Sequence, residues 1–266
     1  MKKNNLLLTL IKEKKLVVFC CFLLFFCCFF SKSAVFGCFL QKNVENNAFQ
    51  VGEILKYKIS YGKSNKKRGK ILAGHASLTV QEGNNEHYQI EAFGKTTRVF
   101  SLFMKVKHRY KSIVEKKSLK SLQFSMEIQE GKHLQDDFME FEYNIDSESK
   151  NDILSAFYKL RSISPLDTQE GDTLFFSYYY NGQVFPSYVI CLGEDIIETK
   201  QFGKIKTMKW SPLLEKGRVF KNTTGAFIWT TSNSMHIPVK LEIPILVGSI
   251  YVNLISEKGI LYDLNK

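Results

Sequence analysis

The chain has 266 residues, so it can bury a sizeable hydrophobic core without disulfides or a structural metal. Aromatic residues make up 14% of it, a high share that suits β-strands, which favour aromatic and β-branched side chains. The formal net charge of +11 is weak support for a nucleic-acid-binding protein, because the first 37 residues alone hold six lysines against one acid and most other charges are scattered.

The N-terminal segment has the pattern of a secretory signal peptide. Lysines precede residues 16–30, which carry no charge, and the small residues Ser31, Ser33 and Ala34 follow. A helix over residues 16–30 is about 22 Å long, which is shorter than the roughly 30 Å hydrocarbon core of a membrane. We therefore expect residues 1–37 to be a signal peptide and the body to be exported, with an uncleaved membrane anchor as the alternative.

Five of the six cysteines lie within residues 20–38. Four of them fall in the apolar segment and act as hydrophobic residues there, since neither their spacing nor a nearby histidine supports zinc binding. The fifth, Cys38, ends the run Val35-Phe36-Gly37-Cys38, which resembles a bacterial lipobox, so Cys38 is a candidate for lipidation. Cleavage after Ser33 or Ala34 by an ordinary signal peptidase is the alternative. Residues 38–50 then form a short tether, and Cys191, as the one internal cysteine, excludes an internal disulfide.

The body beyond this tether alternates apolar and polar residues with period two. In residues 53–61 the apolar row is Leu55, Tyr57, Ile59 and Tyr61, which indicates a half-buried strand. Five similar segments follow, separated by short turns, at residues 71–80, 86–94, 108–115, 122–130 and 133–143. Strands at such regular spacing predict an antiparallel meander closed or half closed into a barrel or sandwich.

Two segments predict short helices. Residues 151–165 offer Asn151 as N-cap, an apolar stripe that includes Leu154 and Tyr158, and Pro165 as the end of the region. Residues 96–106 place Val99, Phe100, Phe103 and Met104 on one stripe, which indicates a helix lying over an apolar cavity or sheet, with a strand as the alternative.

Strands resume after the first of these helices. Asn181-Gly182 between two β-rich runs predicts a tight hairpin, because a type I′ turn needs positive φ at both central residues. A second hairpin is expected about Phe202-Gly203. The apolar phase of residues 238–254 switches at Gly248, which marks a bulge or a tight corner. We see no linker, so residues 51–266 form a single β-rich domain in this interpretation.

The sequence contains no familiar motif for catalysis or metal binding. Its five histidines are dispersed, and HExxH, GxSxG, GxGxxG and P-loop patterns are absent. Asp136-Asp137 is an adjacent carboxylate pair, but neighbours on a strand point to opposite faces and cannot act together as acid and base. The same holds for Glu194-Asp195, which we place at the base of a hairpin. We predict no catalytic residue, cofactor or metal, with a site assembled from distant strands as the open alternative.

Aromatic and basic clusters are the remaining candidates for binding. One hairpin is crowded with Phe175, Phe176, Tyr178, Tyr179 and Tyr180, and Phe227 and Trp229 share a strand face two residues apart. The candidates for lining a ligand site are Phe176, Tyr178, Tyr180, Phe227 and Trp229. Core packing explains them, and the alternative is that they line an apolar ligand held in a half-closed barrel. We interpret the basic runs at residues 63–70 and 114–120 as solvated charges, with an anionic surface such as lipid headgroups as the alternative.

Several segments, taken in order, resemble the domain-of-unknown-function family 3108. They are "VGEILKYKISYG", "AGHASLTV", "KHLQDDFMEFEY", "DILSAFYKLR" and residues 214–254. The resemblance covers roughly residues 50–260 and implies a mostly β, exported protein of a Gram-negative bacterium, located in the periplasm or outer membrane. Residues 231–234, Thr-Ser-Asn-Ser, replace acidic residues that family members often carry, so no cation-binding role is expected at this loop.

We therefore expect a noncatalytic envelope protein whose curved sheet holds an apolar or amphiphilic, lipid-like ligand. The alternative is a structural or assembly factor that binds a protein partner and has a packed interior, and a hydrolase ranks third. Nucleic acid is not an expected partner, whereas association with a membrane through a lipid anchor or an uncleaved signal segment is. An interior cavity of several hundred Å³ fits the ligand carrier, and a packed interior fits the scaffold.

Overall fold

The computed structural model describes residues 46–62, 70–141, 151–163, 168–180, 182–214, 224–245 and 248–264. The predicted signal peptide, the lipidation candidate Cys38 and most of the predicted tether lie outside these residues. Most of the basic run at residues 63–70 does so too. In the described part of the chain, no helix is long and apolar enough to cross a membrane.

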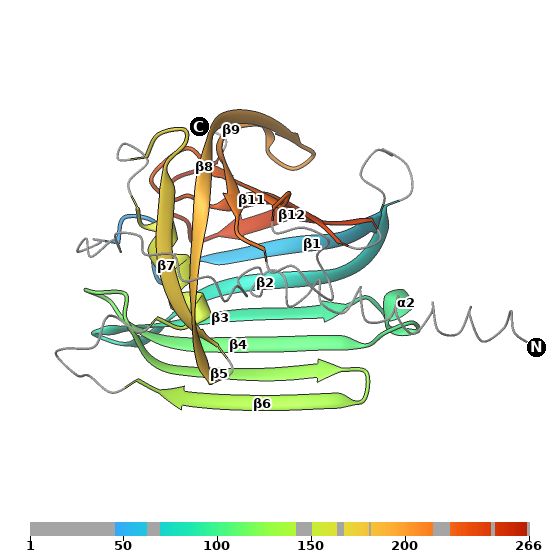
Figure 1. The fold of residues 1–266 in the computed structure, drawn as a ribbon, viewed down its shortest axis with the longest axis vertical. Helices are drawn as coiled ribbons and strands as arrows, with labels where there is room; N and C mark the ends of the chain where they lie inside the picture. The colour runs from blue at the N-terminus through green and yellow to red at the C-terminus, as the bar shows by residue number, and fades with distance from the viewer. Residues whose placement is uncertain are drawn as a thin grey trace, which may run out of the picture.

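The described residues form an antiparallel β-sheet with two helices (Figure 1). The first six strands are β1 (Ile54–Gly62), β2 (Ile71–Asn84), β3 (His87–Thr96), β4 (Val106–Glu115), β5 (Ser121–Glu130) and β6 (His133–Glu140). The other six are β7 (Thr173–Tyr180), β8 (Gln183–Thr199), β9 (Gly203–Pro212), β10 (Phe227–Thr231), β11 (Pro238–Pro244) and β12 (Ser249–Lys258). The helices are α2 (Arg98–Ser101) and α3 (Ile153–Arg161).

Pairing between β1 and β12 joins two meanders into one twelve-stranded sheet. The strand order is β6-β5-β4-β3-β2-β1-β12-β11-β10-β9-β8-β7, so β6 and β7 are the two edges of a sheet that does not close. The sheet curves until β7 and β8 cross in front of β1–β5 in Figure 1. The predicted class, a mainly β protein with an antiparallel meander forming an open or half-closed barrel and one or two short helices, is confirmed.

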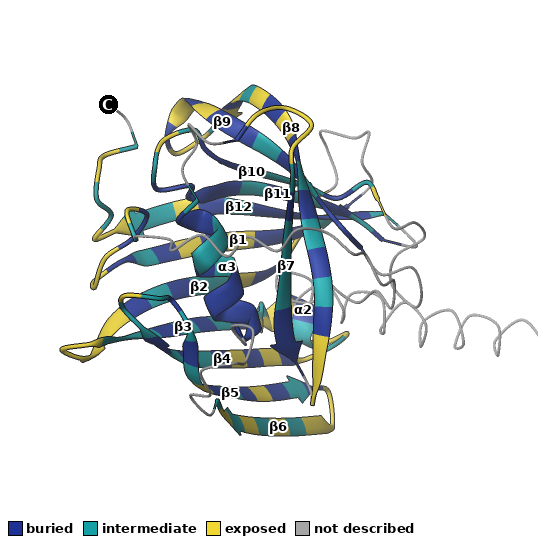
Figure 2. Cartoon of the chain, turned by 60° about the vertical axis from the view of Figure 1, so that its left-hand side comes forward, coloured by how far each residue is buried: buried dark blue, intermediate teal, exposed yellow. Residues whose placement is uncertain are grey.

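Alternation along the strands separates a buried concave face from a more exposed outer face (Figure 2). On β1, Leu55 and Tyr57 are fully buried, whereas Lys56 and Lys58 are exposed. The largest fully buried rings come from several elements and include Tyr57, Tyr110, Phe124, Tyr158 and Tyr178. The hydrophobic core therefore lies on the concave side of the sheet. Successive side chains of a strand point to opposite faces, so the apolar row of each period-two pattern faces this side.

Helix α3 lies against the concave face, where it contacts β3, β4 and β7 (Figure 2). The expected helix is confirmed, but the expected N-cap was wrong by one residue. Asp152 is the cap, because its carboxylate accepts hydrogen bonds from the backbone N–H groups of Leu154 and Ser155. Asn151 instead donates its side-chain amide to the carbonyl oxygen of Leu119 at 2.7 Å.

The helix expected at residues 96–106 is reduced to the single turn α2, which lies beyond the strand ends. Its only buried residue is Phe100, whereas Val99 and Phe103 are 68% and 64% exposed. The expectation that this stripe lies over a cavity or sheet was therefore wrong. The reason is that the chain must turn back within a few residues to enter β4, which begins at Val106.

The expected turns are confirmed at three glycines with positive φ. Gly182 (+81°) and Gly203 (+64°) belong to the turns at either end of β8, and Gly248 (+89°) lies between β11 and β12. A Cβ on Gly248 would come within 2.9 Å of the carbonyl oxygen of Gly62, so this corner requires glycine. Glu194-Asp195 does not lie at a hairpin base as expected. The pair lies within the long strand β8, next to a bulge after Cys191.

Candidate functional site

A buried ion pair connects the end of α3 with the start of the sheet. Arg161 donates from Nη1 to Glu53 Oε1 at 2.7 Å and from Nη2 to Oε2 at 2.8 Å, and both side chains are almost completely buried. Tyr158 donates its hydroxyl to the same carboxylate at 3.3 Å. Burying two charges is unfavourable unless their remaining polar atoms are satisfied, and this bidentate geometry satisfies most of them.

The loop between β10 and β11 completes this cluster. Arg161 donates to the carbonyl oxygen of Met235 from Nε and Nη2, each at 3.3 Å. His236, with a positive φ of 41°, places Nδ1 3.0 Å from the carbonyl oxygen of Arg161. Burial lowers the pKa of His236 to about 4, so the ring is neutral at neutral pH and must carry its proton on Nδ1 to donate to this carbonyl.

A second buried network fixes the other end of α3. The Asp152 carboxylate accepts hydrogen bonds from Ser112 on β4 at 2.5 Å and from Ser121 on β5 at 2.7 Å, besides those from the helix backbone. Burial raises the pKa of Asp152, while the hydrogen bonds from the two serines oppose this rise. Both ends of the helix are thus bonded to other elements, and the helix is held against the concave face.

These buried groups have a structural role in the conformation described. Glu53 and Asp152 have no exposed surface, whereas a general acid or base must reach its substrate. Within the described residues, no group of three or more His, Cys, Asp or Glu side chains could hold a metal ion.

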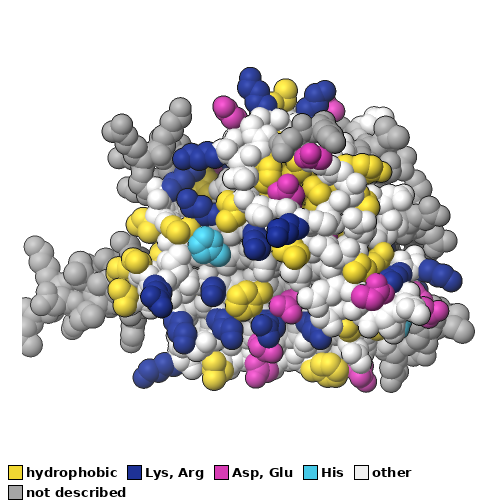
Figure 3. Space-filling model, turned by 180° about the vertical axis from the view of Figure 1, so that it is seen from behind, with side chains coloured by type: hydrophobic (Ala, Val, Ile, Leu, Met, Phe, Trp, Pro, Cys, Tyr) yellow, Lys and Arg dark blue, Asp and Glu magenta, His cyan; other side chains and the backbone are white. Residues whose placement is uncertain are grey.

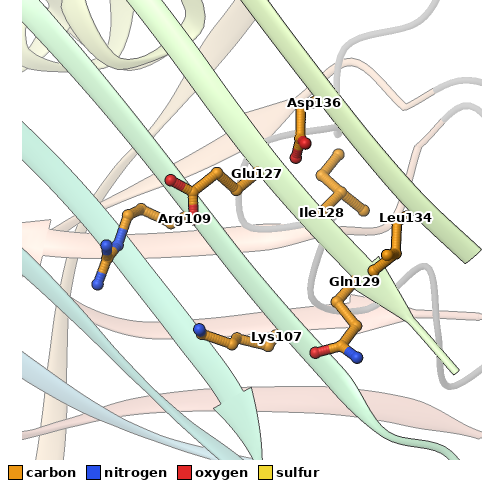
Figure 4. Close-up of a pocket in the computed structure, with 7 residues that line it drawn as sticks. All are labelled: Lys107, Arg109, Glu127, Ile128, Gln129, Leu134 and Asp136. Carbon is orange, nitrogen blue, oxygen red and sulfur yellow. The ribbon is translucent and has the colours of Figure 1, made fainter.

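A small depression of about 170 Å³ lies on the outer face of β4–β6 (Figure 4). Lys107 and Arg109 line it from β4, Glu127 and Gln129 from β5, and Leu134 and Asp136 from β6. The opposite charges of its lining compensate one another in part, and its volume is below the roughly 300–1,000 Å³ of pockets that enclose small molecules. The depression is a polar surface feature rather than an apolar ligand pocket.

The predicted ligand-lining residues of β7 face the concave side. Tyr178 and Tyr180 are buried to within a few per cent, and Phe176 is partly buried. Tyr178 stacks on Phe185 of the neighbouring strand with ring centroids 5.7 Å apart. These residues contribute to the hydrophobic core beside α3, which contacts β7.

Phe227 and Trp229 lie on the opposite, outer face of the sheet. The strand register shows this. Cys191 lies on the concave side of β8, it pairs with Trp210 of β9, and Trp210 pairs with Ile228 of β10, so Ile228 also points to the concave side. Neighbouring residues of a strand point to opposite faces, so Phe227 and Trp229, on either side of Ile228, point outward. The structure therefore does not bring the two predicted groups onto one face.

Two lysines cover the outer aromatic pair. Lys240 Nζ lies 4.0 Å from the ring centre of Trp229, and Lys209 Nζ lies 4.3 Å from that of Phe227. The indole N–H of Trp229 donates to Asp195 Oδ2 at 2.8 Å, and this hydrogen bond holds the pKa of Asp195 below its usual range. The pair is thus a closed cation–π arrangement, in which both rings already have partners.

The register also aligns a basic row across the outer face. From β4 to β9 its members pair in the order Lys107, Lys95, His75, Lys58, Asn253, Lys240, Trp229 and Lys209. Neighbouring strands lie about 4.8 Å apart, so these side chains follow one another closely. Figure 3 shows lysine and arginine side chains gathered on this face.

Sequence reasoning missed the basic row and both buried networks. The signal for the row is weak: each lysine occupies the outward phase of its own strand, and only the strand register brings them together. Glu53 and Arg161 lie 108 positions apart and each resembles an ordinary surface residue in the sequence. Nothing local marks the two as partners.

Comparison with solved structures relates the fold to that of a bacterial protein. The chain is similar to a beta-barrel-like protein of a domain of unknown function, DUF1849, from Brucella abortus, with 10% identity and a TM-score of 0.54, covering 81% of this chain and 100% of that one. It also has a likeness to a hypothetical protein from Chlamydia trachomatis, with 8% identity and a TM-score of 0.38, covering 82% and 92% of the two chains. The first likeness shows a shared fold.

Comparison with protein families gives a match to the model of a protein of unknown function, DUF3108, over residues 56–255. No curated protein matches the chain. The matched residues begin in β1 and end in β12, so they include α3 and every strand between these two. The chain therefore belongs to the DUF3108 family of proteins of unknown function.

Proposed function

We propose that this chain is a noncatalytic protein of the bacterial envelope that acts as a structural or assembly factor and binds a protein partner on its outside. The observation that carries the proposal is the position of α3, which lies on the concave face and contacts β3, β4 and β7. A ligand carried there would have to displace a helix that is hydrogen-bonded at both ends.

The packing of the concave face argues against the ligand-carrier hypothesis. The residues expected to line a ligand site do not share one face of the sheet, because Tyr178 and Tyr180 point to the concave side and the buried Trp229 points to the outer side beneath Lys240. Among the largest buried side chains are five aromatic rings, which fill space that a lipid chain would otherwise use. A packed interior is what we expect of a scaffold.

Strand β6 is the surface that we assign to the partner. It pairs with β5 on one side and is an edge of the sheet on the other, so its second row of backbone groups can pair with an added strand. Leu134 and Phe138 on its outer face are 68% and 62% exposed. An exposed edge with two large apolar side chains is typical of strand addition.

The charge of β6 selects the kind of partner. Asp136 is exposed, and Asp137 Oδ2 is buried without a hydrogen-bond partner in the described part of the chain. An unsatisfied buried carboxylate oxygen is unfavourable, and a lysine or arginine of an added strand would satisfy it. A second copy of β6 would bring acids together, so we assign the edge to an extended segment that carries basic residues.

Export to the envelope is part of the proposal and rests on residues 1–38. The lysines, the uncharged stretch and the lipobox-like run ending in Cys38 support either a lipid-anchored protein or a free periplasmic one. Labelling cells with a clickable fatty acid distinguishes the two. Label in the native chain that disappears in Cys38→Ser indicates an anchor, and an unlabelled native chain of exported size indicates a free protein.

Site-specific photo-crosslinking in cells tests the partner hypothesis. A photoreactive phenylalanine analogue replaces Phe138 on β6, and in a matched control it replaces Ile196 on β8, which is 64% exposed. We expect a discrete protein adduct from position 138 and none from position 196. Mass spectrometry of the adduct should map it to an extended partner segment with lysine or arginine.

Charge reversal adds a test of the proposed chemistry. Asp136→Lys should weaken the adduct from position 138, whereas Glu198→Lys, at an exposed position of β8, should leave it unchanged. Equal adducts from positions 138 and 196, or insensitivity to Asp136→Lys, would contradict the assignment to β6. Native mass spectrometry showing one bound lipid-like molecule per chain in envelope-purified protein would favour the carrier instead.

A further inference from the structure

Five exposed apolar side chains form a protruding group at one end of β2–β4. Val99 lies in the single turn α2, and Leu102 and Phe103 follow it; the three are 68%, 84% and 64% exposed. Ile71 and Leu72, at the start of β2, are 55% and 37% exposed. We call these five residues the apolar tip. Single exposed apolar residues are ordinary, but a cluster of this kind marks an interaction site.

Hydrogen bonds hold the two halves of the tip together. The backbone N–H of Thr97 donates to the carbonyl oxygen of Ala73 at 2.9 Å, and the Thr97 hydroxyl donates to that of Leu72 at 3.3 Å. The same hydroxyl oxygen accepts from the N–H of Phe100 as the cap of α2, and Phe100 itself is buried. The apolar side chains are therefore presented on an ordered turn.

The surroundings of the tip are strongly basic. Residues 95–107 contain four lysines and arginines and no aspartate or glutamate, and Lys70 precedes β2. Lys95, Arg98, Lys105 and Lys107 are all exposed. Glu130, which begins the turn next to Lys105, is buried and paired with His108 at 3.1 Å. At the edge of the molecule where α2 lies, Figure 3 shows hydrophobic side chains bordered by lysine and arginine.

We propose that the apolar tip docks on an anionic lipid surface. Val99, Leu102, Phe103 and the start of β2 enter the headgroup region, and the surrounding cations contact lipid phosphates. Insertion of apolar side chains together with attraction to anionic lipids is the combination by which peripheral proteins bind membranes. The tip protrudes and has no polar atom in its five side chains, which fits a fluid apolar surface better than a shaped protein pocket.

This proposal is independent of the partner assigned to β6. The tip and β6 are different surfaces, and each has its own test. It also does not require lipidation at Cys38, because the tip contacts the membrane through its own side chains. If both contacts occur, the tip fixes the orientation of an anchored body on the membrane.

Fluorescence quenching on vesicles tests the proposal with the full chain. Phe103→Trp introduces a reporter into the tip, and Phe138→Trp, 62% exposed on β6, is the matched control. Vesicles contain phosphatidylcholine with or without phosphatidylglycerol, together with brominated lipids that quench tryptophan only within the bilayer. The signals of Trp210 and Trp229 are subtracted using the unsubstituted chain.

We expect quenching of the reporter at position 103 on anionic vesicles, weaker quenching on neutral ones, and none at position 138. Removing Arg98 or Lys105 by substitution with Gln should weaken binding through the tip about fivefold each, since one basic residue near the surface contributes about 1 kcal/mol. The N-terminal segment can also bind vesicles, so binding of the chain alone does not identify the tip as the contact. The decisive measurement is the quenching of the reporter at position 103.

Two results would overturn the proposal. The first is a vesicle-bound chain whose reporter at position 103 is not quenched, which means that the tip stays in water. The second is quenching that is equal on neutral and anionic vesicles and that does not change in Arg98→Gln or Lys105→Gln. Circular dichroism verifies folding of each variant, and Leu102→Trp, at the most exposed site of the tip, serves as a second reporter.

Discussion

Arg161 at the end of α3 and Glu53 just before β1 form a bidentate ion pair with almost no exposed surface, although they lie 108 positions apart. The pair connects the helix inside the curved sheet with the junction of its two meanders, because β1 pairs with β12. Through Met235 and His236 it also reaches the loop between β10 and β11. The position of α3, which carries the functional proposal, therefore depends on a few buried polar groups.

Breaking one side of this pair should destabilise the protein strongly. Arg161→Met leaves the Glu53 carboxylate buried without its partner, and we expect a loss of about 3–5 kcal/mol in the free energy of unfolding. Urea denaturation followed by circular dichroism measures it. The double variant Glu53→Met/Arg161→Met should lose less than the two single variants together, because no unpaired charge remains.

The partly exposed pair Lys240 and Glu242 is the matched control. Their charged atoms lie 3.8 Å apart with partly exposed side chains, so Glu242→Gln should change stability by less than about 1 kcal/mol. A loss below 1 kcal/mol in Arg161→Met would show that the buried pair does not hold α3.

His236 should make the fold sensitive to mild acid. Burial lowers its pKa from 6.5 to about 4, with the nearby Arg161 charge acting in the same direction, so the unfolded chain binds a proton more readily between these values. The stability that the neutral His236 contributes to the fold is fully present above pH 6.5 and is lost as the pH falls towards 4. At pH 5 the free energy of unfolding is therefore lower by about 2 kcal/mol. Urea denaturation at pH 7 and pH 5 measures the difference.

His236→Asn isolates this effect from other titrating groups. Asparagine tolerates positive φ and can donate to the Arg161 carbonyl, but it does not bind a proton in this range. We expect the variant to lose about 2 kcal/mol less stability than the native chain between pH 7 and pH 5. Parallel pH profiles would contradict the assignment.

Asp152 offers a pair of substitutions that separate shape from charge. Asp152→Ala removes the helix cap and leaves the Ser112 and Ser121 hydroxyls without their acceptor, so we expect a loss of about 2–4 kcal/mol. Asp152→Asn keeps the capping oxygen and adds an amide N–H₂ group that can donate hydrogen bonds to the two serine hydroxyl oxygens. The free energy of unfolding of this variant should therefore fall by about 1 kcal/mol or less. Thermal and urea unfolding compare the two.

The pH dependence of the same variants gives an independent check. Burial raises the folded pKa of Asp152 above its unfolded value, so the folded state binds the proton more tightly. The stability of the native chain relative to Asp152→Asn should therefore rise as the pH falls through the folded pKa. A relative stability that falls in acid would contradict the burial of this carboxylate.

Local pattern was sufficient to predict much of the fold. Period-two alternation identified β1 through Leu55 and Tyr57, and the Asn-Gly pair before β8 identified its hairpin, because both signals arise within a few residues. The N-cap of α3 was misplaced by one position since Asn151 and Asp152 are both capable caps. The choice between them was made by Ser112 and Ser121, which approach from other strands.

The candidate surfaces could not be predicted because they depend on register. Trp229 and Tyr178 both look like inward-facing aromatic residues in the sequence, but the pairing of β8, β9 and β10 places them on opposite faces. The stripe at Val99 and Phe103 is typical of a buried helix face, but the turn lies past the strand ends where no sheet can cover it. The hydrophobic period of a segment does not show which of its faces other parts of the fold will cover.

The hydrogen bond from Trp229 to Asp195 should make one of the two tryptophans sensitive to acid. The indole N–H stabilises the charged carboxylate and lowers the pKa of Asp195, so its contribution is present above the unfolded pKa and is lost as the pH falls through the folded one. We expect the indole N–H resonance of Trp229 to shift in acid, as the pH falls below the ordinary pKa of an aspartate. The Trp210 indole donates to the Thr230 hydroxyl, which does not titrate, and provides the internal control. Asp195→Asn should abolish the shift at Trp229 and leave Trp210 unchanged, whereas two indole resonances that move together would indicate acid unfolding instead of this local contact.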